Sequence, residues 1–280
     1  MRLENPDSFV KASPAEILEK VGEIIEKETK RAEALNPDAF ENIPLFRKEE
    51  IRVGKVVGRG GFCVVREITA IHLMEINDEG EVTQIHKPTT SRLFRRGNSG
   101  VSKPDDEGAS KRELLTRQIW SSRSSKYVLK EVEPELLQND TVTYLKGVID
   151  LGLEAHYLAS LSHNNILKLQ GMVSFGPSEK LGFFIILDQL SEVLSKRLNK
   201  WMHLKRASNG ITGVVTGGRR NKSKLLMERI LVAYDIADAM DYIHRKQIVF
   251  RDLKVRGNPN LIDMCKIFVT SPNHVLHISM

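Results

Sequence analysis

The sequence has little cysteine: only Cys63 and Cys265 occur among its 280 residues. Two cysteines cannot build a disulfide framework of any size, and this scarcity favours a reducing compartment. No apolar run approaches the length of a membrane-spanning helix. The first residues also lack the apolar core of a signal peptide and include Glu4 and Asp7. These absences predict a protein without membrane contact that is located in the cytoplasm, with the nucleus as the alternative.

The composition suits a globular protein with a sizeable core, because 41% of the residues are hydrophobic and 28% are charged. This length fits one large domain or two small ones. A net charge of +6 favours anionic partners such as phosphates. Many of the cations, however, fall in two stretches, 92–103 and 205–224, which we interpret as solvated loops rather than docking or localisation signals. We therefore expect no nucleic-acid binding.

Residues 1–50 form an N-terminal extension that we expect to carry an amphipathic helix. Ser13 and Pro14 are typical of a helix start, as capping residue and first-turn residue. Apolar residues then recur at helical spacing before the segment ends near Asn36: Ile17, Val21, Ile24 and Ile25. We predict that this helix packs on the following domain, with binding to a partner as the alternative.

The region 51–190 is dominated by strand patterns. They lie at 51–57, 63–68, 127–132, 166–173 and 181–187. Glycines join the first two, which predicts a β-hairpin. Residues 142–161 have the wide apolar face of a helix, and the polar stretch 77–125 is interpreted as a disordered insertion.

The region 191–280 is expected to be mainly helical. A short helix at 193–201 precedes the basic loop 205–224, and a strongly apolar helix follows at 225–244. Five strands with one helix, followed by a helical part, predict an α+β fold in two lobes.

Two features of the strand region indicate anion binding. Gly58, Gly60 and Gly61 permit a backbone that closes over phosphates, although a plain tight turn is the alternative. Lys130 lies in an otherwise apolar strand, where a buried ammonium needs an anionic partner. A solvated, outward-facing lysine is the alternative there.

The run Arg251-Asp252-Leu253-Lys254 follows the apolar helix and the β-type pair Ile248-Val249. With the glycine hairpin and Lys130, it resembles the protein-kinase family, whose motifs occur here in the family's order from about Ile51 to Phe268. The resemblance implies a kinase-like two-lobe fold, with a five-stranded antiparallel small lobe, a C-helix and an incomplete helical large lobe.

The resemblance also implies roles for single residues. Asp252 would be the base that accepts the proton of the substrate hydroxyl, and Lys254 would neutralise charge on the transferred phosphoryl group. Glu154 would pair with Lys130, which in the family holds the α- and β-phosphates of ATP. The residues expected at the nucleotide are Val57, Gly58, Gly60, Gly61, Val65, Lys130, Glu154, Asp188 and Leu190.

The chain departs from the family pattern at the glycine loop and at the metal site. Cys63 stands where the family has its third glycine, and Gly257 where it has a metal-binding Asn. Asn258 comes one place late, so the sequence assigns no metal ligand. Val269-Thr270-Ser271 replaces the Asp-Phe-Gly motif, so Mg²⁺ would lose its main protein ligand.

The resemblance implies transfer of the γ-phosphoryl group of ATP to a protein, and Lys254 favours Ser or Thr over Tyr as the acceptor. The alternative is a pseudokinase that binds nucleotide or acts as a scaffold without catalysis. We interpret residues 255–280 as a truncated or mis-spliced end. Because the family buries the helix at 225–244 under later helices, we expect an exposed apolar face that needs a covering partner.

Overall fold

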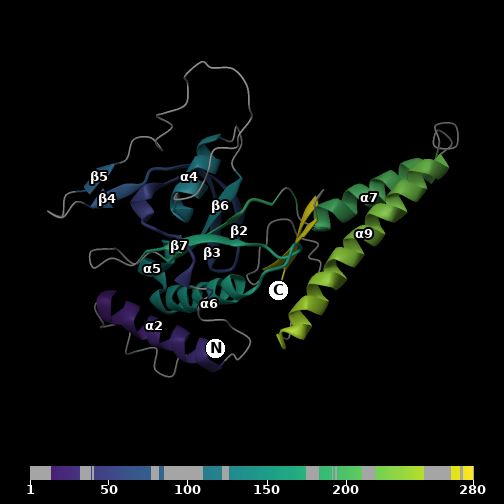
Figure 1. The fold of residues 1–280 in the computed structure, drawn as a ribbon. Helices are drawn as coiled ribbons and strands as arrows, with labels where there is room; N and C mark the ends of the chain where they lie inside the picture. The colour runs from purple at the N-terminus through teal and green to yellow at the C-terminus, as the bar shows by residue number, and fades with distance from the viewer. Residues whose placement is uncertain are drawn as a thin grey trace, which may run out of the picture.

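The computed structural model has an α+β fold in which one mixed sheet is followed by a helical hairpin (Figure 1). The described residues are 14–31, 39, 41–76, 82–84, 110–121, 126–174, 183–190, 192, 194–209, 218–248, 266–271 and 274–279. The predicted fold class is confirmed.

The main sheet contains the five predicted strands and one that the sequence did not reveal. In spatial order its strands are β1 (Leu45–Phe46), β7 (Leu169–Val173), β8 (Phe184–Asp188), β6 (Tyr127–Val132), β3 (Cys63–Ile71) and β2 (Ile51–Arg59). The five longer strands pair antiparallel, as predicted. The added strand β1 runs parallel to β7, so residues of the expected N-terminal extension belong to this sheet.

Helix α6 (Thr141–Ser160) covers one face of the sheet and is covered in turn by α2 (Pro14–Arg31). Asp140 caps α6, because its carboxylate accepts a hydrogen bond from the amide of Thr143 at 3.0 Å. The close approach of α2 requires glycine at position 152, where a Cβ would overlap Cδ1 of Ile25. The predicted packing of the N-terminal helix on the domain is confirmed.

The interpretation of residues 77–125 as disordered needs correction at two places. Residues Val82–Gln84 form β5, which pairs with β4 (Met74–Ile76), and Lys111–Ser121 form helix α4. Helix α4 buries Leu115, Thr116 and Ile119, and its Trp120 indole donates to the carbonyl of Ile71 at 3.0 Å. Apolar and polar contacts together hold this helix against β3.

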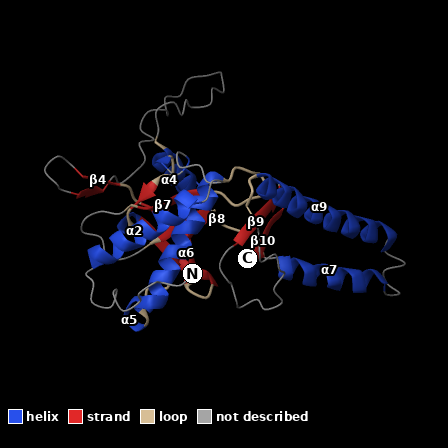
Figure 2. Ribbon diagram, turned by 90° about the horizontal axis from the view of Figure 1, so that it is seen from below, coloured by secondary structure: helices blue, strands red, loops and turns tan. Residues whose placement is uncertain are grey.

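Helices α7 (Leu194–Asn209) and α9 (Gly218–Arg245) are longer than predicted and lie side by side (Figures 1 and 2). They pack through a small separate core of Leu194, Trp201, Leu225 and Val232. The predicted loop 205–224 is therefore wrong at both ends, since 205–209 and 218–224 are helical; 210–217 lie outside the described residues.

Part of the segment 255–280, which we interpret as a truncated or mis-spliced end, forms two strands, and this does not test that interpretation. Strand β9 (Lys266–Ser271) pairs antiparallel with β10 (His274–Ser279), and these strands contact α9 and α7 respectively. The prediction of an exposed apolar face on α9 is confirmed by five large side chains, Leu226, Met227, Ile230, Leu231 and Tyr234. Among the helices that the structure describes, none is both long and apolar enough to cross a bilayer.

Candidate nucleotide site

The strand register brings four predicted or neighbouring residues into one row. Gly58 lies opposite Val65, Val65 opposite Lys130, and Lys130 opposite Ile185, across β2, β3, β6 and β8. Directly opposed residues of antiparallel strands point to the same face. The row therefore places the glycine hairpin, Val65 and the ammonium of Lys130 on one side of the sheet. Val57, next to Gly58, is exposed.

The turn between β2 and β3 is closed by backbone hydrogen bonds and rests near α6. The amide of Gly60 donates to the carbonyl of Cys63 at 2.6 Å, and the carbonyl of Phe62 accepts from the amide of Glu133 at 2.8 Å. A Cβ at Gly147 of α6 would lie 3.2 Å from Cβ of Phe62. The side chain of Cys63 is buried in the core, so it does not fill the space above Gly60 and Gly61.

Lys130 and Glu154 form a buried ion pair, as the resemblance implied. Their residues are 3% and 8% exposed, and Nζ of Lys130 donates to Oε1 of Glu154 at 2.7 Å and also to Oε2. An ammonium and a carboxylate removed from water are tolerated only when each neutralises the other. Helix α6 supplies the carboxylate and β6 the ammonium, so the pair ties the helix to the row of residues above.

Two of the residues expected at the nucleotide lie at the end of β8: Asp188 is its last residue, and Leu190 follows it. The amide of Gln189 donates to the carbonyl of Lys126 at 2.7 Å, and Leu190 packs on the core. Because side chains alternate along a strand, the side chains of Asp188 and Ile185 point to different faces of the sheet. It accepts a hydrogen bond from Gln170 at 3.0 Å and lines a cavity of about 460 Å³. On the face that carries Lys130 and Ile185, Asp188 can therefore contribute only its backbone atoms.

Burial raises the pKa of Asp188, although the hydrogen bond from Gln170 and the charge of Lys168 oppose the shift. A carboxyl with a raised folded-state pKa stabilises the fold while protonated, and this contribution is lost as pH rises through that pKa. Asp188→Asn should therefore be more stable than the parent at pH 7, by no more than about 1 kcal/mol because the carboxyl keeps some contact with water. Urea unfolding from pH 4 to 8 should show the difference shrinking toward acid; a difference independent of pH would contradict this origin.

The sequence did not predict a buried polar cluster around Glu50, which lies between β1 and β2 in the chain. Glu50 is fully buried and accepts hydrogen bonds from the amides of Arg47 and Met74, each at 2.8 Å, and from the guanidinium of Arg112. The guanidinium of Arg112 also lies 5.4 Å from the ring centre of Phe46. No motif marks these residues, because the partners come from segments far apart in the sequence.

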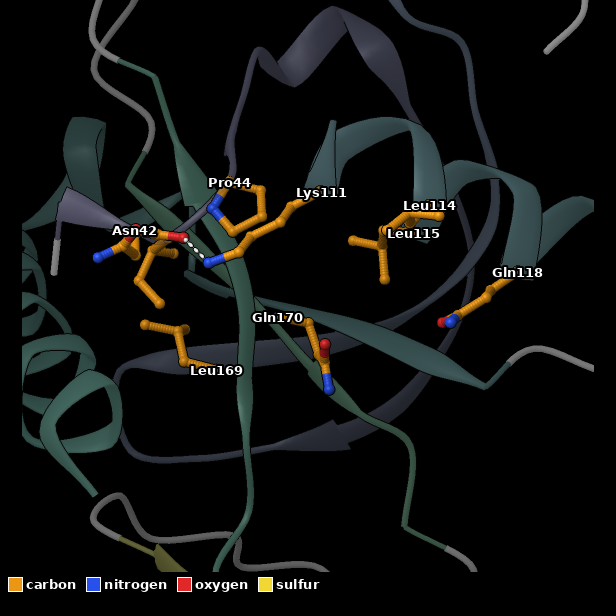
Figure 3. A pocket seen from close by; sticks show the side chains of 9 residues that line it. Asn42, Pro44, Lys111, Leu114, Leu115, Gln118, Leu169 and Gln170 are labelled. Carbon is orange, nitrogen blue, oxygen red and sulfur yellow. Dashed lines mark hydrogen bonds between the residues drawn. The ribbon is translucent and has the colours of Figure 1, made fainter. Parts of the chain in front are cut away.

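A cavity of about 220 Å³ separates α4 from β7 and the residues before β1 (Figure 3). Lys111 bridges it by donating to the carbonyl of Asn42 at 3.0 Å. Leu114, Leu115 and Leu169 supply apolar walls. This cavity is separate from the residues predicted to bind nucleotide, and its contacts fix α4 to the sheet.

The turn after α6 fixes α9 beside the sheet. The imidazole Nε2 of His163 lies 3.2 Å from Oδ2 of Asp238, and the amide nitrogen of Asn165 donates to the same oxygen at 3.2 Å. The backbone amide of Ser162 donates to the hydroxyl of Tyr242 at 3.0 Å. These contacts set where α9 ends, and the segment with Asp252 begins just after it.

Three predicted residues, Asp252, Lys254 and Asn258, lie outside the described residues. In the parts of the chain that are described, no group of three or more His, Cys, Asp or Glu side chains could hold a metal ion.

A comparison with protein families gives an independent result. Residues 136–263 match the family model of protein tyrosine and serine/threonine kinases. The kinase match spans Glu154, Asp188, Asp252 and Lys254, and it does not separate the tyrosine from the serine/threonine type. The glycine hairpin and Lys130 precede it, but the sheet places them in register with the matched strand β8. No curated protein matches the chain.

The family match includes α6, β7 and β8, which belong to the main sheet and its covering helix. The match indicates a kinase-like segment at 136–263. The structure adds an α+β arrangement in which α6 covers the main sheet. Proteins of the matched family use ATP and Mg²⁺ as their usual reactants and a protein as their usual substrate.

Proposed function

We propose that this chain is an ATP-binding kinase domain that transfers the γ-phosphoryl group of ATP to Ser or Thr of a protein. The observation that carries the proposal is the buried pair of Lys130 and Glu154 in register with the glycine hairpin. Lysine is almost never fully buried unless it is paired, and this pair holds the ammonium of Lys130 in the same row as the glycine hairpin. Lys254 supports Ser or Thr as the acceptor.

The proposed roles follow the order of the residues in the fold. The backbone at Gly58, Gly60 and Gly61 would lie over the phosphates, with the amide of Gly60 already bound to the carbonyl of Cys63, and Val65 would pack on the base. Lys130 would bind the α- and β-phosphates while Glu154 holds its ammonium in place. The backbone at Asp188 and Leu190 would bind the edge of the base.

The proposed chemistry is assigned to two residues. Asp252 would accept the proton of the attacking hydroxyl, and Lys254 would offset the negative charge that the transferred group carries. ATP supplies the phosphoryl group, with Mg²⁺ as its usual counterion.

A second function, nucleotide binding or scaffolding without catalysis, is favoured by one specific observation. Residues 269–271, which replace the Asp-Phe-Gly motif, lie in β9 and pair with 274, 275 and 276 of β10. Thr270 and Ser271 carry no carboxylate with which to bind Mg²⁺ between phosphates.

Two measurements separate the functions. Transfer of labelled γ-phosphate to a mixed protein substrate, with Mg²⁺ or Mn²⁺, should be detectable and should fall at least about 100-fold in Asp252→Asn. Activity that survives this substitution would remove Asp252 from its role. Thermal unfolding with ATP, with and without metal, tests binding alone: a shift without transfer supports the non-catalytic function, and no shift in either condition contradicts nucleotide binding and therefore the kinase function.

A further inference from the structure

Helix α9 has two apolar faces, and the described part of the chain covers one of them. Leu225, Val232, Ala239 and Ile243 are buried against α7 or the main core. Five further side chains are between 53% and 66% exposed: Leu226, Met227, Ile230, Leu231 and Tyr234. At 100° per residue these five lie on the side of the helix opposite the buried set. We call them the α9 strip.

An apolar strip of this size is uncommon on the surface of a monomer, since each exposed side chain loses the gain of burial. Figures 1 and 2 both show α7 and α9 projecting away from the main sheet. Because α7 packs on the buried face of α9, it leaves the α9 strip open. The described residues therefore leave the strip accessible to a second helix.

Charge is distributed unevenly about the middle of the strip, Ile230. Lys224 is exposed before it, whereas Asp235 and Asp238 follow it. All three flank the same side of the α9 strip at helical spacing. Asp241 is neutralised within the helix by Arg245, and Asp238 also contacts His163 and Asn165. Asp235 is therefore the principal acidic group on this flank.

This polarity matches a second copy of the same helix. If two α9 helices cross antiparallel at Ile230, Lys224 of each copy lies beside Asp235 of the other, and the contact occurs twice. A parallel two-fold pair would instead place the Lys224 and Asp235 flanks of the two copies on opposite sides of the interface, so these contacts would not form. A two-fold interface is also the commonest form of association for identical chains, because one self-complementary patch suffices.

We propose that the α9 strip is a homodimer interface in which the α9 helices of two copies pack antiparallel about a two-fold axis at Ile230. The apolar side chains fill the centre of the interface, and the Lys224 and Asp235 pairs fix its direction. This assignment does not depend on nucleotide binding or on catalysis.

Sedimentation velocity of the full chain over a wide concentration range tests the interface. The parent chain should form a dimer, and Leu226→Glu/Ile230→Glu should raise the dimer dissociation constant at least about 100-fold. Both side chains are exposed in a single copy, so circular dichroism should show unchanged helix content. Leu45→Glu, an exposed leucine on the sheet edge, is the matched control and should leave the dimer intact.

Charge reversal and cross-linking test the orientation. Lys224→Glu and Asp235→Lys should each weaken the dimer about 10-fold, and the two together should restore it, because each copy then carries both reversed charges. Ser223→Cys mixed with Ala237→Cys should cross-link under mild oxidation, since these positions are equally far from Ile230 on either side. Ser223→Cys alone should not exceed the parent chain.

Four outcomes would overturn the proposal. They are a monomer at every concentration, an open-ended series of larger species, a dimer that Leu226→Glu/Ile230→Glu leaves intact, and a double charge reversal that fails to restore association. The last outcome would assign the strip to a different kind of partner.

Discussion

Glu154→Ala should lower the free energy of unfolding by about 3 kcal/mol, because it removes the carboxylate that neutralises the buried ammonium of Lys130. Lys130 is only 3% exposed, so water cannot replace the lost carboxylate in the folded state. Urea unfolding followed by circular dichroism gives the value. Lys130→Met should be destabilising by a similar amount, since it leaves Glu154 unpaired instead.

The double variant Lys130→Met/Glu154→Leu distinguishes a buried ion pair from simple loss of packing. Replacing both charges by apolar side chains of similar size removes the need for neutralisation, so its stability should return to within about 1 kcal/mol of the parent. Tyr157→Phe is the matched control on the same helix. It removes a polar group from a partly exposed side chain without changing a charge, so stability should change by less than about 1 kcal/mol. Additive losses in the double variant would contradict the coupling.

The second large effect is expected at Glu50, far from the candidate nucleotide site. Glu50→Ala removes the acceptor for two backbone amides and the partner of Arg112. We expect a loss of about 3–5 kcal/mol, since buried donors and a buried cation are then unsatisfied. Hydrogen exchange should show residues 111–121 losing protection first, because Arg112 ties α4 to the sheet.

Glu49→Ala is the control for this prediction. Glu49 lies next to Glu50 in the same short helical turn, Lys48–Glu50, but is exposed. Its removal should change stability by less than about 0.5 kcal/mol. Equal effects of the two substitutions would show that the buried carboxylate of Glu50 is not what holds α4 in place.

The elements that sequence reasoning found are those with strong local patterns. β-Branched runs marked β2, β3, β6 and β8, and the wide apolar face marked α6. The pairing of Lys130 with Glu154 came from a family resemblance rather than from periodicity, since the two residues lie on different elements. The order of the family motifs along the chain indicated this pairing, whereas no local sequence pattern did.

The elements that were missed depend on contacts between distant segments. Helix α4 has only a weak apolar face and is held by Arg112, whose partner Glu50 lies 62 residues away. Strand β1 is two residues long, too short for any alternation to show. The added turns of α7 and α9 at 205–209 and 218–224 are rich in Lys and Arg, so they resemble a solvated loop in composition. Of the candidate site, the row from Gly58 to Lys130 could be expected, whereas the positions of Asp252 and Lys254 are not tested.

The contact between Ile25 and Gly152 links the N-terminal helix to the ion pair. Gly152 lies two residues before Glu154 on α6, so α2 presses on the helix beside the residue that neutralises Lys130. We therefore expect docking of α2 and formation of the pair to be coupled, and such a coupling free energy acts equally in both directions. Whatever releases residues 14–31 from α6 reduces, by that amount, the preference of Glu154 for Lys130.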